Sequence, residues 1–249
     1  MRESGYPRAV LRSRLRRIRL PILCYHEIGS PPSKYVVAPA DFEAQLDWMT
    51  GAGFELLTMD DVAAVVAGER AAPVRGVALT FDDGRAGVRD FAAPALARRS
   101  LPATLYLVTQ WLGGIGIPET ERYSGFVGWS DLPALRAAGI VLGSHTLSHP
   151  NLKRIGAADA EREIRDSRAR LEERLGCAAL HFSYPYGRRT RAIERMVRAA
   201  GYRTAVVTGQ RCNGRFAHAH RLFRLRIDGR DGAQGVQRSL EECRGAPAP

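Results

Sequence analysis

The sequence is poor in cysteine and lysine and has no long apolar run, and each shortage narrows the possible classes of protein. The four cysteines, Cys24, Cys177, Cys212 and Cys243, are widely separated and form no C-x-x-C pair, so neither a zinc knuckle nor a disulfide framework is indicated. No apolar stretch near the amino terminus is long enough for a signal-peptide core or a membrane span. We therefore expect a reducing compartment, with the cytoplasm as the default location and action at the cell surface left open.

The positive charge is almost entirely arginine. The chain carries 37 basic and 26 acidic residues, for a formal net charge of +11, and its only lysines are Lys34 and Lys153. Seven arginines lie between Arg2 and Arg19. We interpret residues 1–20 as a flexible, solvated basic arm, with weak contact to an anionic surface as the alternative. We expect no nucleic-acid partner, and the sequence carries no signal for an oligomeric state.

Short β-rich runs alternate with helical ones along the rest of the chain. A length of 249 residues, 45% of them hydrophobic, suits a single α/β barrel. The alternation predicts parallel strands joined by crossover helices. We expect about eight strands and a distorted (β/α) barrel in one domain, residues 21–249. The predicted strands lie at residues 21–27, 54–59, 76–82, 103–109, 140–146, 180–185, 202–209 and 222–227.

Two adjacent acids stand where one of these strands ends, in the stretch RGVALTFDDGRAG. Parallel barrels place their chemistry where strands end and the following loops begin. Asp82 and Asp83 lie at such an end, His145 lies at the end of IVLGSHT, and Tyr186 follows LHFSYP. Three strand ends that are distant in sequence are thus predicted to converge on one rim of the barrel.

The stretch SHTLSHP carries two histidines four residues apart. That spacing puts both imidazoles on one side of a turn, and Pro150 restricts His149, so we expect a loop or a single turn. Two histidines and one carboxylate form a common zinc triad with an open fourth position. An isolated H-x-x-x-H pair is more often incidental, but its combination with paired acids at strand ends favours a metal site.

Three motifs follow one another in the order found in a known enzyme family. TFDDG at 80–84, SHTLSH at 144–149 and FSYPYG at 182–187 resemble the first motifs of the polysaccharide deacetylases, the family 4 carbohydrate esterases, in their exopolysaccharide-type form. The similarity covers roughly residues 21–228. The resemblance implies Zn²⁺ or another divalent transition metal held by Asp83, His145 and His149, with Asp82 as the base and the backbone N–H of Tyr186 as an oxyanion donor.

Two departures from the family pattern concern the base and the acid. Ser183 stands where many relatives carry an arginine that orients the catalytic aspartate. The L-x-H motif that supplies a proton to the leaving amine is missing in its usual form. We take His220 as the candidate acid, with His218 and His26 as the alternatives.

Aromatic residues are concentrated in the loop of residues 111–129. Trp111, Tyr123, Phe126 and Trp129 can stack on a sugar ring or enclose an acetyl methyl group, although packing against the barrel is the expectation for any one of them.

The sequence therefore predicts a metal-dependent hydrolase that removes N-acetyl groups from N-acetylhexosamine units of a polysaccharide or glycoconjugate. Two alternatives stay open. One is an amidohydrolase of the same fold that acts on a small non-sugar amide, and the other is a catalytically silent glycan-binding relative. The intact TFDDG argues against the silent relative, because a binding surface has no need for Asp82.

Overall fold

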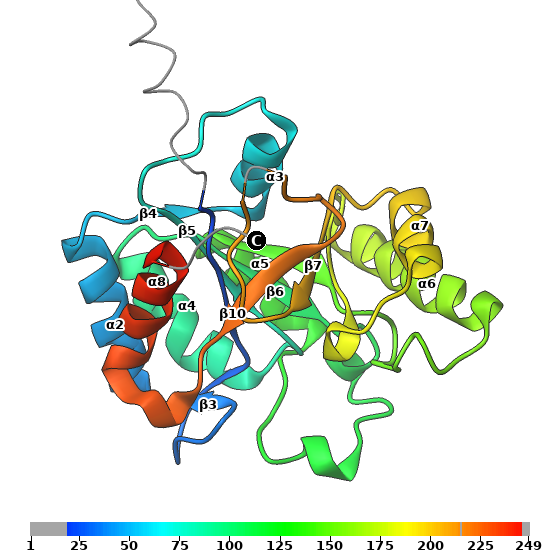
Figure 1. Cartoon of the computed structure of the whole chain (residues 1–249). Coiled ribbons are helices and arrows are strands. Elements are labelled where there is room, and N and C mark those ends of the chain that lie inside the picture. The colour runs from blue at the N-terminus through cyan, green and yellow to red at the C-terminus, as the bar shows by residue number, and fades with distance from the viewer. Residues whose placement is uncertain (1–18, 215, 246–249) are drawn as a thin grey trace, which may run out of the picture.

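Eight parallel strands form the central sheet, and seven of them close into a barrel (Figure 1). The computed structural model describes residues 19–214 and 216–245. In spatial order the barrel consists of β1 (Ile22–Tyr25), β10 (Leu222–Arg226), β9 (Thr204–Thr208), β8 (His181–Ser183), β7 (Ile140–Ser144), β6 (Ala103–Leu107) and β5 (Gly76–Phe81). Pairing of β5 with β1 closes it, and β4 (Glu55–Leu57) extends the sheet beside β5. Each predicted run contains one of these strands, so the distorted (β/α) barrel is confirmed.

Helices cover the outside of the barrel (Figure 1). Local signals fix several of their ends: Thr58 and Asp61 form a capping box at the start of α3, and Thr190 accepts a hydrogen bond from the Ile193 N–H at the start of α7. The helices are α2 (Pro39–Gly51), α3 (Met59–Ala67), α4 (Ala93–Arg98), α5 (Leu132–Ala137), α6 (Ala157–Leu175), α7 (Arg191–Ala199) and α8 (Gly235–Gly245). Two short strands, β2 (Glu27–Ile28) and β3 (Val36–Val37), pair outside the barrel.

Alternation along β5 separates an apolar layer from a polar interior. Phe81 packs outward against Phe42 of α2, with ring centroids 5.8 Å apart. Because successive side chains of a strand face opposite sides, Thr80 and Asp82 face the interior. There both are buried and hydrogen-bonded to Arg224 of β10. The carboxyl end of the barrel is therefore lined with polar groups.

The structure holds a disulfide between two cysteines, although their spacing in the sequence indicated no disulfide framework. Cys212, in the connection between β9 and β10, is bonded to Cys243 of α8, and their Cα atoms are 5.6 Å apart. Their separation of 31 positions gives no spacing signal, because only the folded barrel brings α8 to this connection. Of the other two cysteines, Cys24 is buried and Cys177 is exposed.

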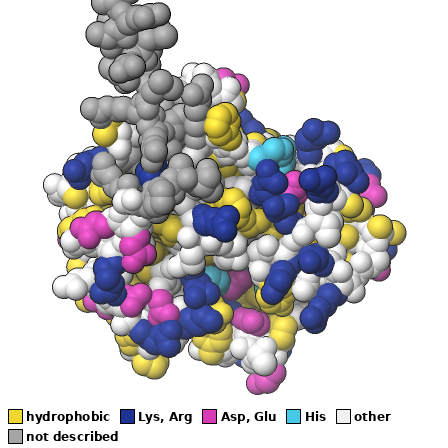
Figure 2. Space-filling view, in the orientation of Figure 1, with side chains coloured by type: hydrophobic (Ala, Val, Ile, Leu, Met, Phe, Trp, Pro, Cys, Tyr) yellow, Lys and Arg dark blue, Asp and Glu magenta, His cyan; other side chains and the backbone are white. Residues whose placement is uncertain are grey.

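The predicted basic arm lies outside the described residues except for Arg19 and Leu20. Leu20 is buried and pairs with Asn213 in an antiparallel bridge, so it belongs to the folded domain. Basic side chains gather over α6 and α7 on the face shown in Figure 2. Within the described part of the chain, no helix combines the length and the apolar character needed to span a membrane.

Candidate metal centre and active site

Three of the predicted ligands meet at the carboxyl end of the barrel. Asp83 follows β5, and His145 and His149 follow β7. The Asp83 Oδ1 lies 3.6 Å from the His145 Nε2 and 3.7 Å from the His149 Nε2, and the two Nε2 atoms are 3.2 Å apart. Ligands bound to zinc at about 2.0–2.1 Å in a tetrahedron are separated by about 3.3 Å. The three atoms therefore have the spacing of one face of a zinc coordination sphere.

The protonation of the two imidazoles also fits a metal. The His145 Nδ1 lies 2.8 Å from the Ser183 carbonyl oxygen, so Nδ1–H donates and the Nε2 lone pair faces the cluster. Burial lowers the pKa of His149 to about 4, which leaves its ring neutral near pH 7. Two lone-pair nitrogens facing each other beside a carboxylate are the donor set of a divalent metal site.

Left-handed backbone occurs at several residues of this rim. Asp83, Thr146, His149 and Tyr186 have φ values of 71°, 72°, 65° and 58°. Such conformations are costly for residues other than glycine and persist where the surrounding contacts enforce them. The spacing of the motifs in the sequence gives no indication of this constraint.

Glu163 of α6 is the main anchor of the histidine loop. Its Oε2 accepts hydrogen bonds of 2.9 Å from the backbone N–H groups of Leu147 and Ser148, and its Oε1 accepts one of 2.6 Å from the Ser148 hydroxyl. These three bonds fix the turn that brings His149 back toward His145. Sequence reasoning missed Glu163, because the residue lies in a helix with many charged residues and no local motif marks it.

Asp82 is held by an arginine from the last strand of the barrel. The Arg224 Nη1 donates to Oδ1 at 2.7 Å and Nη2 donates to Oδ2 at 2.6 Å, and both side chains are buried. Burial alone would raise the pKa of Asp82, but the Arg224 guanidinium holds that pKa well below its usual range. Asp82 is therefore an ionised carboxylate with a fixed orientation.

The position of Arg224 also explains why a small residue, Ser183, stands at this point of β8. The Ser183 hydroxyl accepts a hydrogen bond of 3.0 Å from the Arg224 Nη2 and lies 3.4 Å from the Asp82 Oδ2. The small side chain on β8 thus leaves room for a guanidinium that arrives from β10. An arginine at an inward position of the apolar run LFRLRI was the available signal, which sequence reasoning did not use.

The histidines proposed as acids lie at opposite ends of the barrel. His220 precedes β10, and its Nε2 lies 2.8 Å from the carbonyl oxygen of Tyr202, which precedes β9. His218 lies beside it, with ring centroids 6.0 Å apart. Since the strands are parallel, both lie at the amino end, away from Asp82. His26 instead follows β1 at the carboxyl end, so the structure brings only His26 to the rim.

Tyr186 lies at the rim beside the predicted metal ligands. It follows β8, and its ring, which is mostly exposed, lies over His149 with centroids 4.7 Å apart. The buried ring of Trp111 lies 5.2 Å from the His149 ring. His149 is thus in contact with two aromatic rings.

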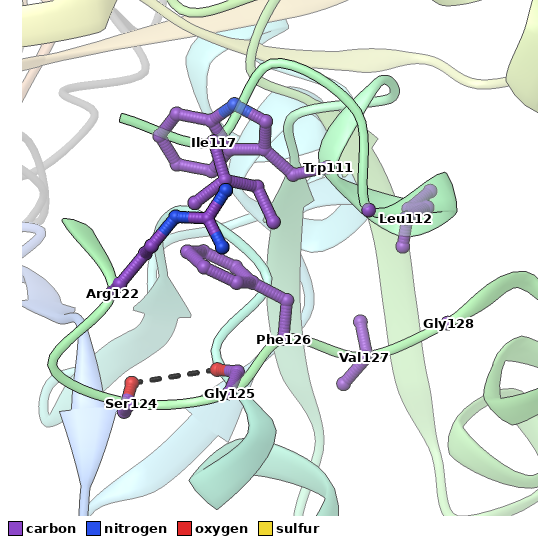
Figure 3. Close-up of a pocket in the computed structure, with 10 residues that line it drawn as sticks. Trp111, Leu112, Ile117, Arg122, Ser124, Gly125, Phe126, Val127 and Gly128 are labelled. Carbon is purple, nitrogen blue, oxygen red and sulfur yellow. Dashed lines mark hydrogen bonds between the residues drawn. The ribbon is translucent and has the colours of Figure 1, made fainter. Parts of the chain in front are cut away.

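The loop after β6 borders the metal centre and encloses a cleft of about 380 Å³ (Figure 3). Trp111, Ile117, Arg122 and Phe126 point toward one another in this cleft. Next to it, the buried guanidinium of Arg85 lies 4.2 Å from the ring centroid of Tyr123 and 4.5 Å from that of Phe126.

Arg85 connects the loop of residues 111–129 with the TFDDG motif that contains Asp82 and Asp83. Its guanidinium pairs with the Glu121 carboxylate, and its Nε lies 3.7 Å from the Asp83 Oδ2. Trp129 and Tyr123 differ in their exposure to solvent. The Trp129 ring packs beside Arg174, whereas Tyr123 is about half exposed. Packing accounts for Trp111 and Trp129, as expected, whereas Tyr123 is accessible from solvent.

The fold and the rim define a barrel that carries a candidate metal site of one carboxylate and two histidines, and comparison with known proteins gives the family. The polysaccharide deacetylase family model matches residues 69–205, and the chain belongs to this family. The chain is 25% identical to the putative polysaccharide deacetylase YxkH of Bacillus subtilis over 209 residues, which are 84% of this chain and 71% of that protein. Members of the family generally use a divalent metal.

Solved deacetylase structures share the fold. The Streptococcus pyogenes deacetylase PplD superposes with a TM-score of 0.79 at 22% identity, covering 90% of this chain and 99% of that one. IcaB from Ammonifex degensii superposes with a TM-score of 0.77 at 23% identity, covering 90% and 97%.

Proposed function

We propose that this chain is a zinc-dependent N-deacetylase that acts on N-acetylhexosamine units of a polysaccharide or glycoconjugate. The observation that carries the proposal is the divergence of the two adjacent acids. The Asp83 carboxylate faces His145 and His149, whereas the Asp82 carboxylate is bound by Arg224. One acid is thus available as a metal ligand and its neighbour as a base, the two roles that amide hydrolysis needs.

Asp83, His145 and His149 would hold the metal. When bound, a divalent metal lowers the pKa of water and polarises the amide carbonyl group. The Asp82 Oδ2 lies 3.9 Å from the His145 Nε2, so the base is beside the proposed metal ligands, while both of its oxygens accept hydrogen bonds from Arg224. Ionised and held by Arg224, Asp82 accepts the proton of the attacking water.

The remaining roles fall to residues around the same rim. The backbone N–H of Tyr186 serves as the oxyanion donor, a role supported by the position of this residue next to His149. His26 replaces His220 as the proposed proton donor to the leaving amine, because it is the candidate at the catalytic end. The exposed Tyr123 ring offers a surface on which a sugar can stack.

The test is acetate release by the zinc-loaded protein from a panel of N-acetylated glycans, with small non-sugar amides in parallel. The proposal predicts turnover on glycans and a loss of about 10²–10⁴-fold in Asp82→Asn, with its metal content retained. Turnover confined to the small amides would make the chain an amidohydrolase. Glycan binding without acetate release at full metal content would make it a binding protein.

A further inference from the structure

Asp82 also belongs to a second group of potential metal ligands, together with Cys24 and His26. Cys24 and His26 are alternate residues at the end of β1, so their side chains project to the same side of the strand. The Cys24 Sγ is buried and lies 3.7 Å from the Asp82 Oδ2. Ligand atoms of Cys24, His26 and Asp82 all lie within 4.8 Å of one another.

One of these three side chains, that of His26, has a buried nitrogen, Nδ1, without a hydrogen-bond partner among the described residues. A buried polar atom without a partner is costly, and a bound cation would supply the missing interaction. Thiolate, imidazole and carboxylate together are ligands that zinc and cadmium prefer and that magnesium and calcium do not.

We propose that Cys24, His26 and Asp82 form a second, weaker site for a thiophilic divalent metal, and that its occupation inhibits the enzyme. Binding breaks the Cys24 S–H bond and forms a sulfur–metal bond, and the proton leaves to solvent. The Cys24 thiolate and the Asp82 carboxylate neutralise the two positive charges of the metal. The Arg224 guanidinium beside them adds one further positive charge.

The charges explain why this site is the weaker of the two. Burial raises the pKa of the Cys24 thiol well above its usual range, so the metal must displace a firmly held proton. A metal already bound at Asp83, His145 and His149 also repels a second one, because the Asp82 Oδ2 is only 3.9 Å from the His145 Nε2. The second site therefore fills only after the first.

The second metal would inhibit the enzyme because it binds two residues that the reaction uses. This part of the inference rests on the proposed function. Asp82 is the proposed base and His26 the proposed acid. A metal bound to both removes the lone pairs that the reaction uses. Metal binding itself does not depend on what the enzyme hydrolyses.

Cadmium titration of Cys177→Ser protein tests the binding, since this substitution removes the exposed free thiol and leaves Cys24 as the remaining one. We expect two ions per chain, with an ultraviolet thiolate-to-cadmium absorption band that grows with the second. Adding Cys24→Ser should remove the band and the second ion. The site is refuted if the Cys177→Ser protein binds one ion, or binds two without the band. The Cys177→Ser protein alone therefore decides whether the site exists. Cys24→Ala replaces Cys24→Ser if the latter does not fold.

Excess zinc tests the inhibition, with each rate expressed relative to that of the same variant at one equivalent of zinc. Cys24→Ser should require at least about tenfold more zinc for half-inhibition than the Cys177→Ser protein, because loss of even an outer-shell partner weakens metal binding by that factor. Equal inhibition of the two proteins would refute the inhibitory role. Absence of deacetylation with the cadmium band intact would refute the proposed function and leave the second site standing.

Discussion

The Arg224 guanidinium and the Asp82 carboxylate face each other through two parallel hydrogen bonds of 2.7 and 2.6 Å, in the buried interior of the barrel. The two residues are 142 positions apart in the sequence. A bidentate pair of this kind fixes both the direction and the charge of the carboxylate. The orientation of the proposed base is therefore set by the last strand of the barrel.

Arg224→Ala should destabilise the fold by about 3–5 kcal/mol, because it leaves the Asp82 carboxylate buried without its partner. Arg224→Lys keeps the charge but loses the paired geometry, so we expect a folded protein whose kcat falls by about 10²-fold. Denaturant unfolding and acetate release measure the two effects. Arg226→Lys, on the same strand, is the matched control. Full activity in Arg224→Lys would show that the bidentate geometry is not required.

The lowered pKa of His149 predicts a pH-dependent stability of the metal-free chain. Between pH 6.5 and about 4 the unfolded chain binds a proton at this residue and the folded chain does not. Stability should therefore fall as the pH decreases through this window, by about 3 kcal/mol in total. Urea unfolding in the presence of a chelator measures this slope, and His149→Gln should flatten it. An unchanged slope in the variant would assign the effect to another group.

Removal of the Glu163 anchor should weaken metal binding without removing a ligand. Glu163→Gln loses the charge that receives the N–H groups of Leu147 and Ser148, so we expect the affinity for zinc to fall by about 10–100-fold. Competition with a chromophoric chelator measures the affinity. Glu161→Gln, exposed on the same helix, serves as the control. Equal affinities in the two variants would mean that the loop holds its shape without Glu163.

The position of His26 predicts that it, and not His220, affects the chemical step. His26→Gln should lower kcat by about 10²–10⁴-fold, while His220→Gln keeps the parental rate, because His220 is bound to the Tyr202 carbonyl at the other end of the barrel. Metal content, measured on both variants, separates loss of the acid from loss of the metal. If both variants turn over at the parental rate, Asp82 must return the proton that it took from water.

Local patterns were enough to predict the barrel and the meeting of Asp83, His145 and His149 on one rim. Apolar runs with helical segments between them gave the strands, and residues at strand ends gave the cluster of Asp83, His145 and His149, since parallel strands end on one rim. Arg224 and the Cys212–Cys243 pair were missed because each depends on which distant strands become neighbours. The position of His220 could not be predicted for a different reason, because closeness to a predicted strand in the sequence does not show at which end of the barrel a side chain lies.

Closure of the barrel by β10 has a consequence for the order in which the enzyme is made. A chain emerging from the ribosome has all three metal ligands once residue 149 has been added, and it has Tyr186 soon after. It lacks Arg224 until β10 is made, and β10 is the strand that joins β9 to β1. An incomplete chain therefore holds the metal ligands without a fixed base. The strand that closes the barrel is therefore also the strand that fixes the proposed base.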